Sequence, residues 1–140
     1  MWCADMGGRG TFAAGNPVDY VYEYANEEIN GVKVLKGKKI PGQKTEHGLP
    51  ESSHSSSAYI KLDQNGNFKE MRLYDKNHCL YLELAYHSER NLGPGKILHY
   101  HKYGPSFSLT TEGSGSRSKA IKMTKAMKKH FKKYFKGLKI

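Results

Sequence analysis

The chain has 140 residues, 37% of them hydrophobic, which is enough for a single domain with one modest core. It contains no run of about 18 apolar residues and no charged start followed by an apolar stretch, which argues against a transmembrane helix and a signal peptide. Residues 1–116 hold 13 Lys/Arg and 13 Asp/Glu, whereas residues 117–140 hold 10 Lys/Arg and no acid. The net charge of +10 therefore comes from the C-terminal segment, which should attract nucleic-acid phosphates, anionic lipid or an acidic protein.

The N-terminal part is predicted to be irregular, with two strands. Residues 1–17 are rich in Gly and Ala and are expected to form a flexible arm. Alternating apolar side chains predict a strand over 18–24. An Asn-Gly turn and the stretch "VKVL" predict another within 29–37. Residues 37–57 show no periodicity, and loops of that length are commonly functional or disordered.

Four strands with short connections are predicted next. "SAYIKLD" (57–63) and "FKEMRLYD" (68–75) flank a hairpin turn at 64–67, and "KNHC" (76–79) leads into "LYLELAYH" (80–87). A loop containing Gly93-Pro94-Gly95 precedes the fourth strand, "ILHYHKY" (97–103). Short connections of this kind predict an antiparallel meander.

A Gly/Ser linker and a basic amphipathic helix are predicted at the C-terminus. Apolar residues recur at helical spacing between Met123 and Leu138, lysines fill the other faces, and Gly137 is a plausible end of the helix. The expected organisation is an arm over 1–17, a β-rich body over 18–112, and a linker with a helix packed on the body over 113–140. The predicted fold is α+β: a four-stranded antiparallel meander with a C-terminal amphipathic helix and an irregular, strand-containing N-terminal part.

Side-chain alternation divides the predicted sheet into two faces. One face is apolar and includes Leu80, Leu82 and Leu84, so it should be covered by a helix or by loops. The opposite, polar face gathers titratable groups, and a solvated face with ordinary cross-strand pairs is the alternative interpretation. The residues on it include Arg72, Tyr74, Glu83, His87, His99 and His101.

This set of side chains suits phosphodiester cleavage by acid–base catalysis without a cofactor. Two of His87, His99 and His101 could remove the 2′-hydroxyl proton and protonate the leaving 5′-oxygen. Arg72 could stabilise charge on the phosphate, and Glu83 shares the face. The residues expected to bind substrate are the base-stacking Tyr74, the phosphate-gripping His54 and Ser56, and Lys125, Lys129 and Lys132 of the helix.

A metal site is the main chemical alternative. His99 and His101 on one strand, with His87 on its neighbour, could form a three-histidine zinc site. We expect no metal, because a His-x-His pattern on a strand also arises by chance. Cys3 and Cys79 fit no zinc or redox spacing and are expected to be reduced thiols of a cytosolic protein.

Part of the chain resembles a known family. "MRLYDKNHCLYLELAYHSE" followed by "LHYHKY" resembles the R-x-Y-D and H-x-H signature of toxin-like domains in bacteriophage head proteins and polymorphic toxins. Those domains are similar to the barnase, EndoU, colicin and RelE superfamily of small ribonuclease-like folds, and the resemblance covers residues 47–103. It implies metal-independent RNA cleavage that leaves a 2′,3′-cyclic phosphate, with Arg72, His87, His99 and His101 on matching positions.

The resemblance also implies a setting and partners. The protein would act in the cytoplasm of a bacterial host or in the virion, on RNA or other nucleic acid, with a phage head protein or an immunity protein as a further partner. The superfamily usually places helices before the sheet, whereas residues 1–56 here look strand-like. Two other hypotheses stay open: a non-catalytic phage module that binds nucleic acid or a head protein, and membrane attachment through the basic helix.

Overall fold

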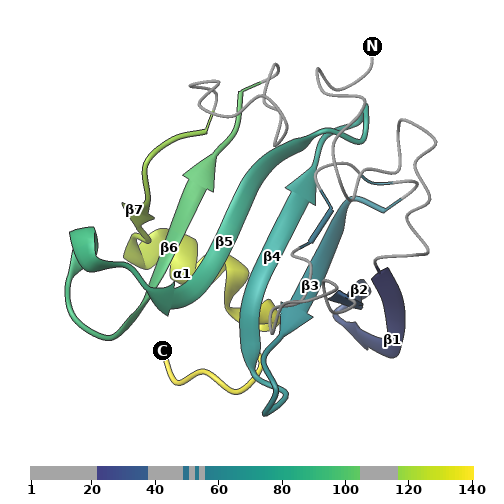
Figure 1. The fold of residues 1–140 in the computed structure, drawn as a ribbon, viewed down its shortest axis with the longest axis horizontal. Helices are drawn as coiled ribbons and strands as arrows, with labels where there is room; N and C mark the ends of the chain where they lie inside the picture. The colour runs from purple at the N-terminus through teal and green to yellow at the C-terminus, as the bar shows by residue number, and fades with distance from the viewer. Residues whose placement is uncertain (1–21, 38–48, 51–52, 54–55, 105–116) are drawn as a thin grey trace, which may run out of the picture.

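The computed structural model describes residues 22–37, 49–50, 53, 56–104 and 117–140. In these ranges the strands form a single seven-stranded sheet whose spatial order follows the sequence (Figure 1). The predicted arm over 1–17 and most of the predicted loop over 37–57 lie outside the described residues, as does residue 54. The strands are β1 Tyr22–Ile29, β2 Val32–Gly37, β3 Ala58–Leu62, β4 Phe68–Tyr74, β5 Leu80–Ser88, β6 Lys96–Lys102 and β7 Ile121–Lys122.

The α+β class is confirmed, but the predicted count of four strands is wrong. The antiparallel meander is present as β3 to β6. It is extended on one side by β2, which pairs with β3 in parallel, and by the antiparallel strand β1. On the other side β7 pairs with β6. The strands at β1 and β2 were predicted, but their pairing with the meander was not, and β7 was missed because a two-residue strand leaves little periodicity in the sequence.

The C-terminal segment covers the apolar face of the sheet. Its helix α1 (Lys125–Phe131) and a 3₁₀ turn (Lys132–Tyr134) lie behind the strands in Figure 1. Met123 and Phe135 are 3% and 4% exposed and belong to the main core, which they share with strand residues. Those strand residues are Val34, Ala58, Ile60, Phe68, Met71, Leu84 and Leu98.

The helix is shorter than the periodicity predicts. Ile121 and Lys122 pair with β6, so the chain enters this segment as a strand. The hydroxyl of Thr124 then accepts a hydrogen bond from the Met127 backbone N–H, which caps the helix at its start. Hydrophobic residues beyond the helix still reach the core, because the following turns present them to the same face.

A second, smaller hydrophobic cluster lies on the opposite face, called the polar face below. It combines aliphatic and tyrosine side chains: Leu35, Leu49, Tyr59, Tyr74, Leu80 and Tyr103. Leu80 was predicted on the apolar face with Leu82 and Leu84. The register between β4 and β5 shifts after the pair Leu73–Leu82, so that Leu80 stands opposite Tyr74. A β-bulge of this kind reverses the alternation of side chains on one side of it, which explains the error.

Candidate active site

A buried ion pair occupies the polar face where β4 and β5 meet. Arg72 and Glu83 are direct cross-strand partners, and the Arg72 Nε lies 2.7 Å from Glu83 Oε2. Arg72 Nη1 also donates to the backbone carbonyl of Leu49. The two residues are 8% and 4% exposed, so the pair is almost withdrawn from water. Two sequence-predicted site residues are thus in direct contact.

The second oxygen of Glu83 faces two residues that sequence reasoning did not place in the site. The Tyr103 hydroxyl donates to Glu83 Oε1 at 3.2 Å, and Arg117 Nη2 lies 3.5 Å from the same oxygen. Arg117 Nε donates to the Tyr103 hydroxyl at 3.0 Å. Arg117 follows a long connection, and no sequence signal links it to Glu83.

These contacts set the charge state of the cluster. Burial opposes ionisation of Glu83, but the charges of Arg72 and Arg117 outweigh it and lower its pKa to about 2. Burial also opposes the charge on Arg72, yet Glu83 raises its pKa. Burial and the nearby carboxylate raise the pKa of Tyr103 to about 12. At neutral pH the cluster therefore holds a carboxylate, two guanidinium cations and a neutral phenol.

The predicted histidines form a row beside this cluster. His101 is the cross-strand partner of Glu83, and the row continues to His99 and His87. The ring centroids of His99 and His101 are 5.6 Å apart, and those of His99 and His87 are 4.6 Å apart. The structure therefore brings together all five residues that the sequence analysis proposed as catalytic.

Backbone carbonyls fix how each imidazole presents its nitrogens. The Nδ1 atoms of His101, His99 and His87 contact the carbonyl oxygens of Ser118, Ile97 and Ser88 at 2.9, 2.8 and 3.0 Å, respectively. A carbonyl can only accept, so each Nδ1 carries a proton and each neutral ring presents Nε2 as an acceptor.

His99 is the buried member of the row. It is fully buried, and within the described part of the chain its Nε2 has no hydrogen-bond partner. Burial, with smaller contributions from His87 and His101, lowers its pKa. A neutral His99 packs between the rings of His87 and His101 without adding a charge to the row.

The predicted substrate-binding residues are dispersed. Tyr74 donates to the carbonyl of Pro50 and packs edge-on against Tyr59, so it belongs to the second cluster. Ser56 is half-buried just before β3, and His54 lies outside the described residues. Lys125, Lys129 and Lys132 are exposed on the segment that packs on the apolar face, so the structure does not place them beside Glu83.

Three further observations bear on the predicted chemistry. Among the residues that the structure describes, no three His, Cys, Asp or Glu side chains are grouped to hold a metal ion. No helix in the same ranges is both long and apolar enough to span a membrane. Cys79 is disulfide-bonded, so the prediction of a reduced thiol is wrong there, and Cys3 lies outside the described residues.

Comparison with known protein families, with curated proteins and with solved structures found no match.

Proposed function

We propose that this chain is a metal-independent endoribonuclease that cleaves RNA by acid–base transesterification, as its resemblance to phage-associated toxin-like domains implies. The proposal is supported mainly by the residues that surround Glu83. Its carboxylate is contacted by Arg72, Arg117 and Tyr103, and His101 stands directly across the strand pair. A base, an acid and two cations are the groups that this reaction requires.

Each group then has a defined part in the step. Glu83 accepts the proton of the ribose 2′-hydroxyl, and the 2′-oxygen attacks phosphorus. The bond to the 5′-oxygen breaks, and a protonated His101 donates its proton to that leaving group. Arg72 and Arg117 stabilise the charge on the phosphoryl oxygens, and the products are a 2′,3′-cyclic phosphate and a 5′-hydroxyl.

Substrate binding would also make Glu83 a stronger general base. The pKa of Glu83 is lowered to about 2 by its arginine neighbours, which makes it a weak base in the free protein. A phosphate that engages the half-exposed Arg117 would compete with the carboxylate for that cation. The pKa of Glu83 would then rise towards the range in which a carboxylate removes a proton more effectively.

The test is cleavage of a short labelled RNA at low salt with excess chelator. The parent is expected to release cyclic-phosphate products, and Glu83→Gln and His101→Ala should each reduce the rate at least about a hundredfold. The matched control is His130→Ala, which removes an exposed histidine of α1 and should cleave like the parent. Circular dichroism of each variant separates lost catalysis from lost folding.

Two outcomes would contradict the proposal: no cleavage by a folded parent, or an unchanged rate in folded Glu83→Gln. The burial of Arg72 and Glu83 supports a second candidate, a non-catalytic module in which the pair is structural and the same face binds nucleic acid or a head protein. That candidate predicts RNA or head-protein binding by a parent that cleaves nothing.

A further inference from the structure

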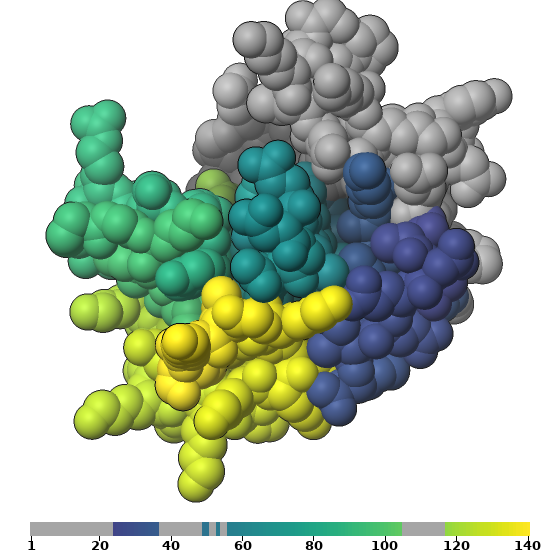
Figure 2. Space-filling view, turned by 90° about the horizontal axis from the view of Figure 1, so that it is seen from below, coloured from purple at the N-terminus to yellow at the C-terminus, as the bar shows by residue number. Residues whose placement is uncertain are grey.

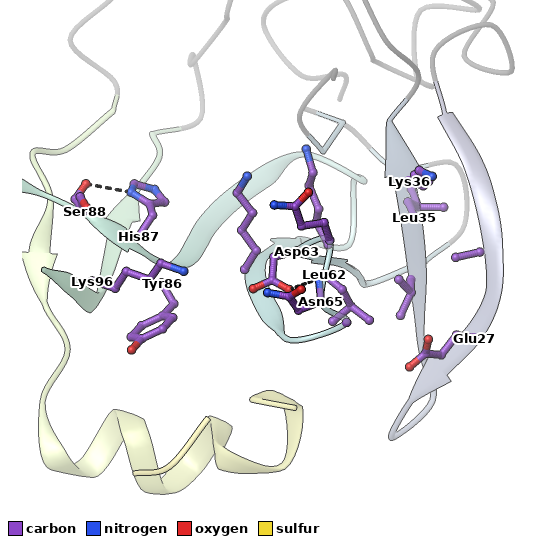
Figure 3. A pocket seen from close by; sticks show the side chains of 16 residues that line it. Glu27, Leu35, Lys36, Leu62, Asp63, Asn65, Tyr86, His87, Ser88 and Lys96 are labelled. Carbon is purple, nitrogen blue, oxygen red and sulfur yellow. Dashed lines mark hydrogen bonds between the residues drawn. The ribbon is translucent and has the colours of Figure 1, made fainter. Parts of the chain in front are cut away.

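A groove of about 1110 Å³ runs across one end of the sheet. Figure 3 shows His87, Tyr86 and Lys96 on one wall and Lys36 and Leu35 on the other, with the β3–β4 turn between them. Figure 2 shows the outside of the same region, where the β3–β4 turn lies between the β5–β6 connection and the β1–β2 hairpin. The groove is open to solvent between its two walls and is not an enclosed small-molecule cavity.

Four lysines from different strands line this groove: Lys36, Lys61, Lys69 and Lys96. Two acidic residues, Glu27 and Asp63, also line it. Glu27 pairs with Lys136 at 2.6 Å. Asp63 accepts backbone N–H groups of Asn65 and Asn67 within the β3–β4 turn. Four lysines against two carboxylates, one of which is paired with Lys136, leave a net positive charge on the surface that a ligand would meet.

The groove is connected to the candidate active site through His87. His87 lines the groove, and its ring packs 4.6 Å from that of His99, which lies next to His101. Tyr86 lines the groove on the same strand, with the Lys96 Nζ 6.0 Å from the centre of its ring.

We propose that this groove binds the sugar-phosphate backbone of single-stranded RNA that extends from the cleavage site. The proposal rests on the ribonuclease function proposed above. It assigns substrate binding to Lys36, Lys69 and Lys96, in place of Lys125, Lys129 and Lys132. A polyanion in this groove would pass His87 and reach the row of histidines that ends opposite Glu83.

The test measures binding of a labelled single-stranded 2′-O-methyl RNA of about ten nucleotides, which lacks the attacking hydroxyl and cannot be cleaved. The variant Lys36→Gln/Lys69→Gln/Lys96→Gln should bind at least about tenfold more weakly near 50 mM salt. The slope of log affinity against log salt should fall in magnitude by about two, the value for three lost phosphate contacts. Replacing the same three lysines with arginine should preserve binding.

The matched control is Lys125→Gln/Lys129→Gln/Lys132→Gln, which removes the same charge from residues that do not line the groove. It should bind within about threefold of the parent, because local contacts rather than net charge hold the strand. Equal losses in the two glutamine variants would overturn the proposal, as would unchanged binding in the groove variant. Melting temperatures confirm that each variant is folded.

The two proposals fail in distinguishable ways. If the parent binds the oligonucleotide through the groove lysines but cleaves no RNA, the ribonuclease proposal fails and the groove remains a single-strand site. If the parent cleaves RNA and the groove variant binds and cleaves equally well, the groove proposal fails alone.

Discussion

Arg72 and Glu83 contribute both to the stability of the fold and to the proposed catalysis. Both side chains are almost fully buried, and burying a charge is costly unless it is paired and hydrogen-bonded. Each partner therefore depends on the other. Removing one leaves the second as an uncompensated charge inside the protein.

Arg72→Met is expected to lower the free energy of unfolding by roughly 3–5 kcal/mol, because it leaves the Glu83 carboxylate buried without its nearest cation. The double variant Arg72→Met/Glu83→Leu should recover most of that loss. Urea denaturation of both variants measures the effect. A single substitution that costs less than about 1 kcal/mol would show that Glu83 is not held by Arg72.

His99 makes stability depend on pH. Burial lowers the pKa of His99 in the folded protein below its ordinary value near 6.5. At a pH between these two pKa values, the unfolded chain binds a proton at His99 and the folded chain does not. Stability is therefore fully present above about pH 6.5 and is lost as the pH falls through this window. The titratable groups near the ring are His87, His101 and Glu89.

The corresponding measurement is the free energy of unfolding between about pH 7 and pH 5. His99→Gln, which cannot titrate, should show a smaller fall in stability than the parent over this range. His130→Gln, which replaces an exposed residue of α1, should follow the parent. Identical curves for the parent and His99→Gln would contradict the expected linkage.

At the level of secondary-structure elements, the sequence predicts those strands whose side chains alternate regularly between polar and apolar. Strands β3 to β6 follow from alternating side chains and Asn/Gly turns, and the same alternation places Arg72, Glu83 and His101 on one face. The alternation places Leu80 on the wrong face, because a β-bulge adds one residue to the strand and so reverses the faces beyond it. The local sequence does not indicate this bulge.

Contacts across long connections were beyond sequence reasoning. Arg117 reaches Glu83, and Ile121 joins the sheet, only because the chain returns antiparallel to β6. The lysine-rich groove likewise depends on the tertiary arrangement of β2, β3, β4 and β6. Of its lysines only Lys96 is close in sequence to the histidines, so composition alone pointed to the helix.

Gly137 ends the C-terminal turns in the left-handed conformation, with φ of 79°, and packs against Asn67. A Cβ at this position would lie 1.9 Å from Asn67 Oδ1, so Gly137→Ala should destabilise the protein by roughly 2 kcal/mol or more. The comparison is Gly95→Ala, where φ is also positive at 73° but a Cβ meets no atom within 4 Å.

Gly95→Ala is therefore expected to cost only the backbone strain, about 1 kcal/mol. Comparing the melting temperatures of Gly95→Ala and Gly137→Ala separates the effect of backbone strain from that of the clash with Asn67. Removing the opposing side chain in Gly137→Ala/Asn67→Gly should restore part of the loss. Equal destabilisation by the two alanine substitutions would mean that the Asn67 contact has no effect.

At the level of the whole molecule, the basic C-terminal segment is part of the fold. Phe135 packs against Phe68 with ring centroids 4.8 Å apart, and the Phe68 backbone N–H donates to the Lys136 carbonyl at 2.8 Å. The Asn30 side chain donates to the Lys133 carbonyl at 2.7 Å. Its lysines therefore project from a fixed surface on the side of the sheet away from Glu83.

Phe135→Ala should lower the free energy of unfolding by about 3–5 kcal/mol, because it leaves a cavity beside Phe68 and Met71. Lys132→Ala, an exposed neighbour, should change it by no more than about 0.5 kcal/mol. Urea denaturation compares the two. Equal and small effects would indicate that the C-terminal segment does not pack on the sheet.

The outer strands of the sheet bear on how the protein behaves at high concentration. An exposed strand edge is a template for pairing with another chain, and proteins block it with charges, bulges or short strands. In β1 the register shifts between Tyr24 and Glu28, where Asn26 has φ of 57°, and Glu27 and Glu28 add negative charge. At the other end β7 has two residues. Both features discourage edge-to-edge pairing of the outer strands of the described sheet with other chains.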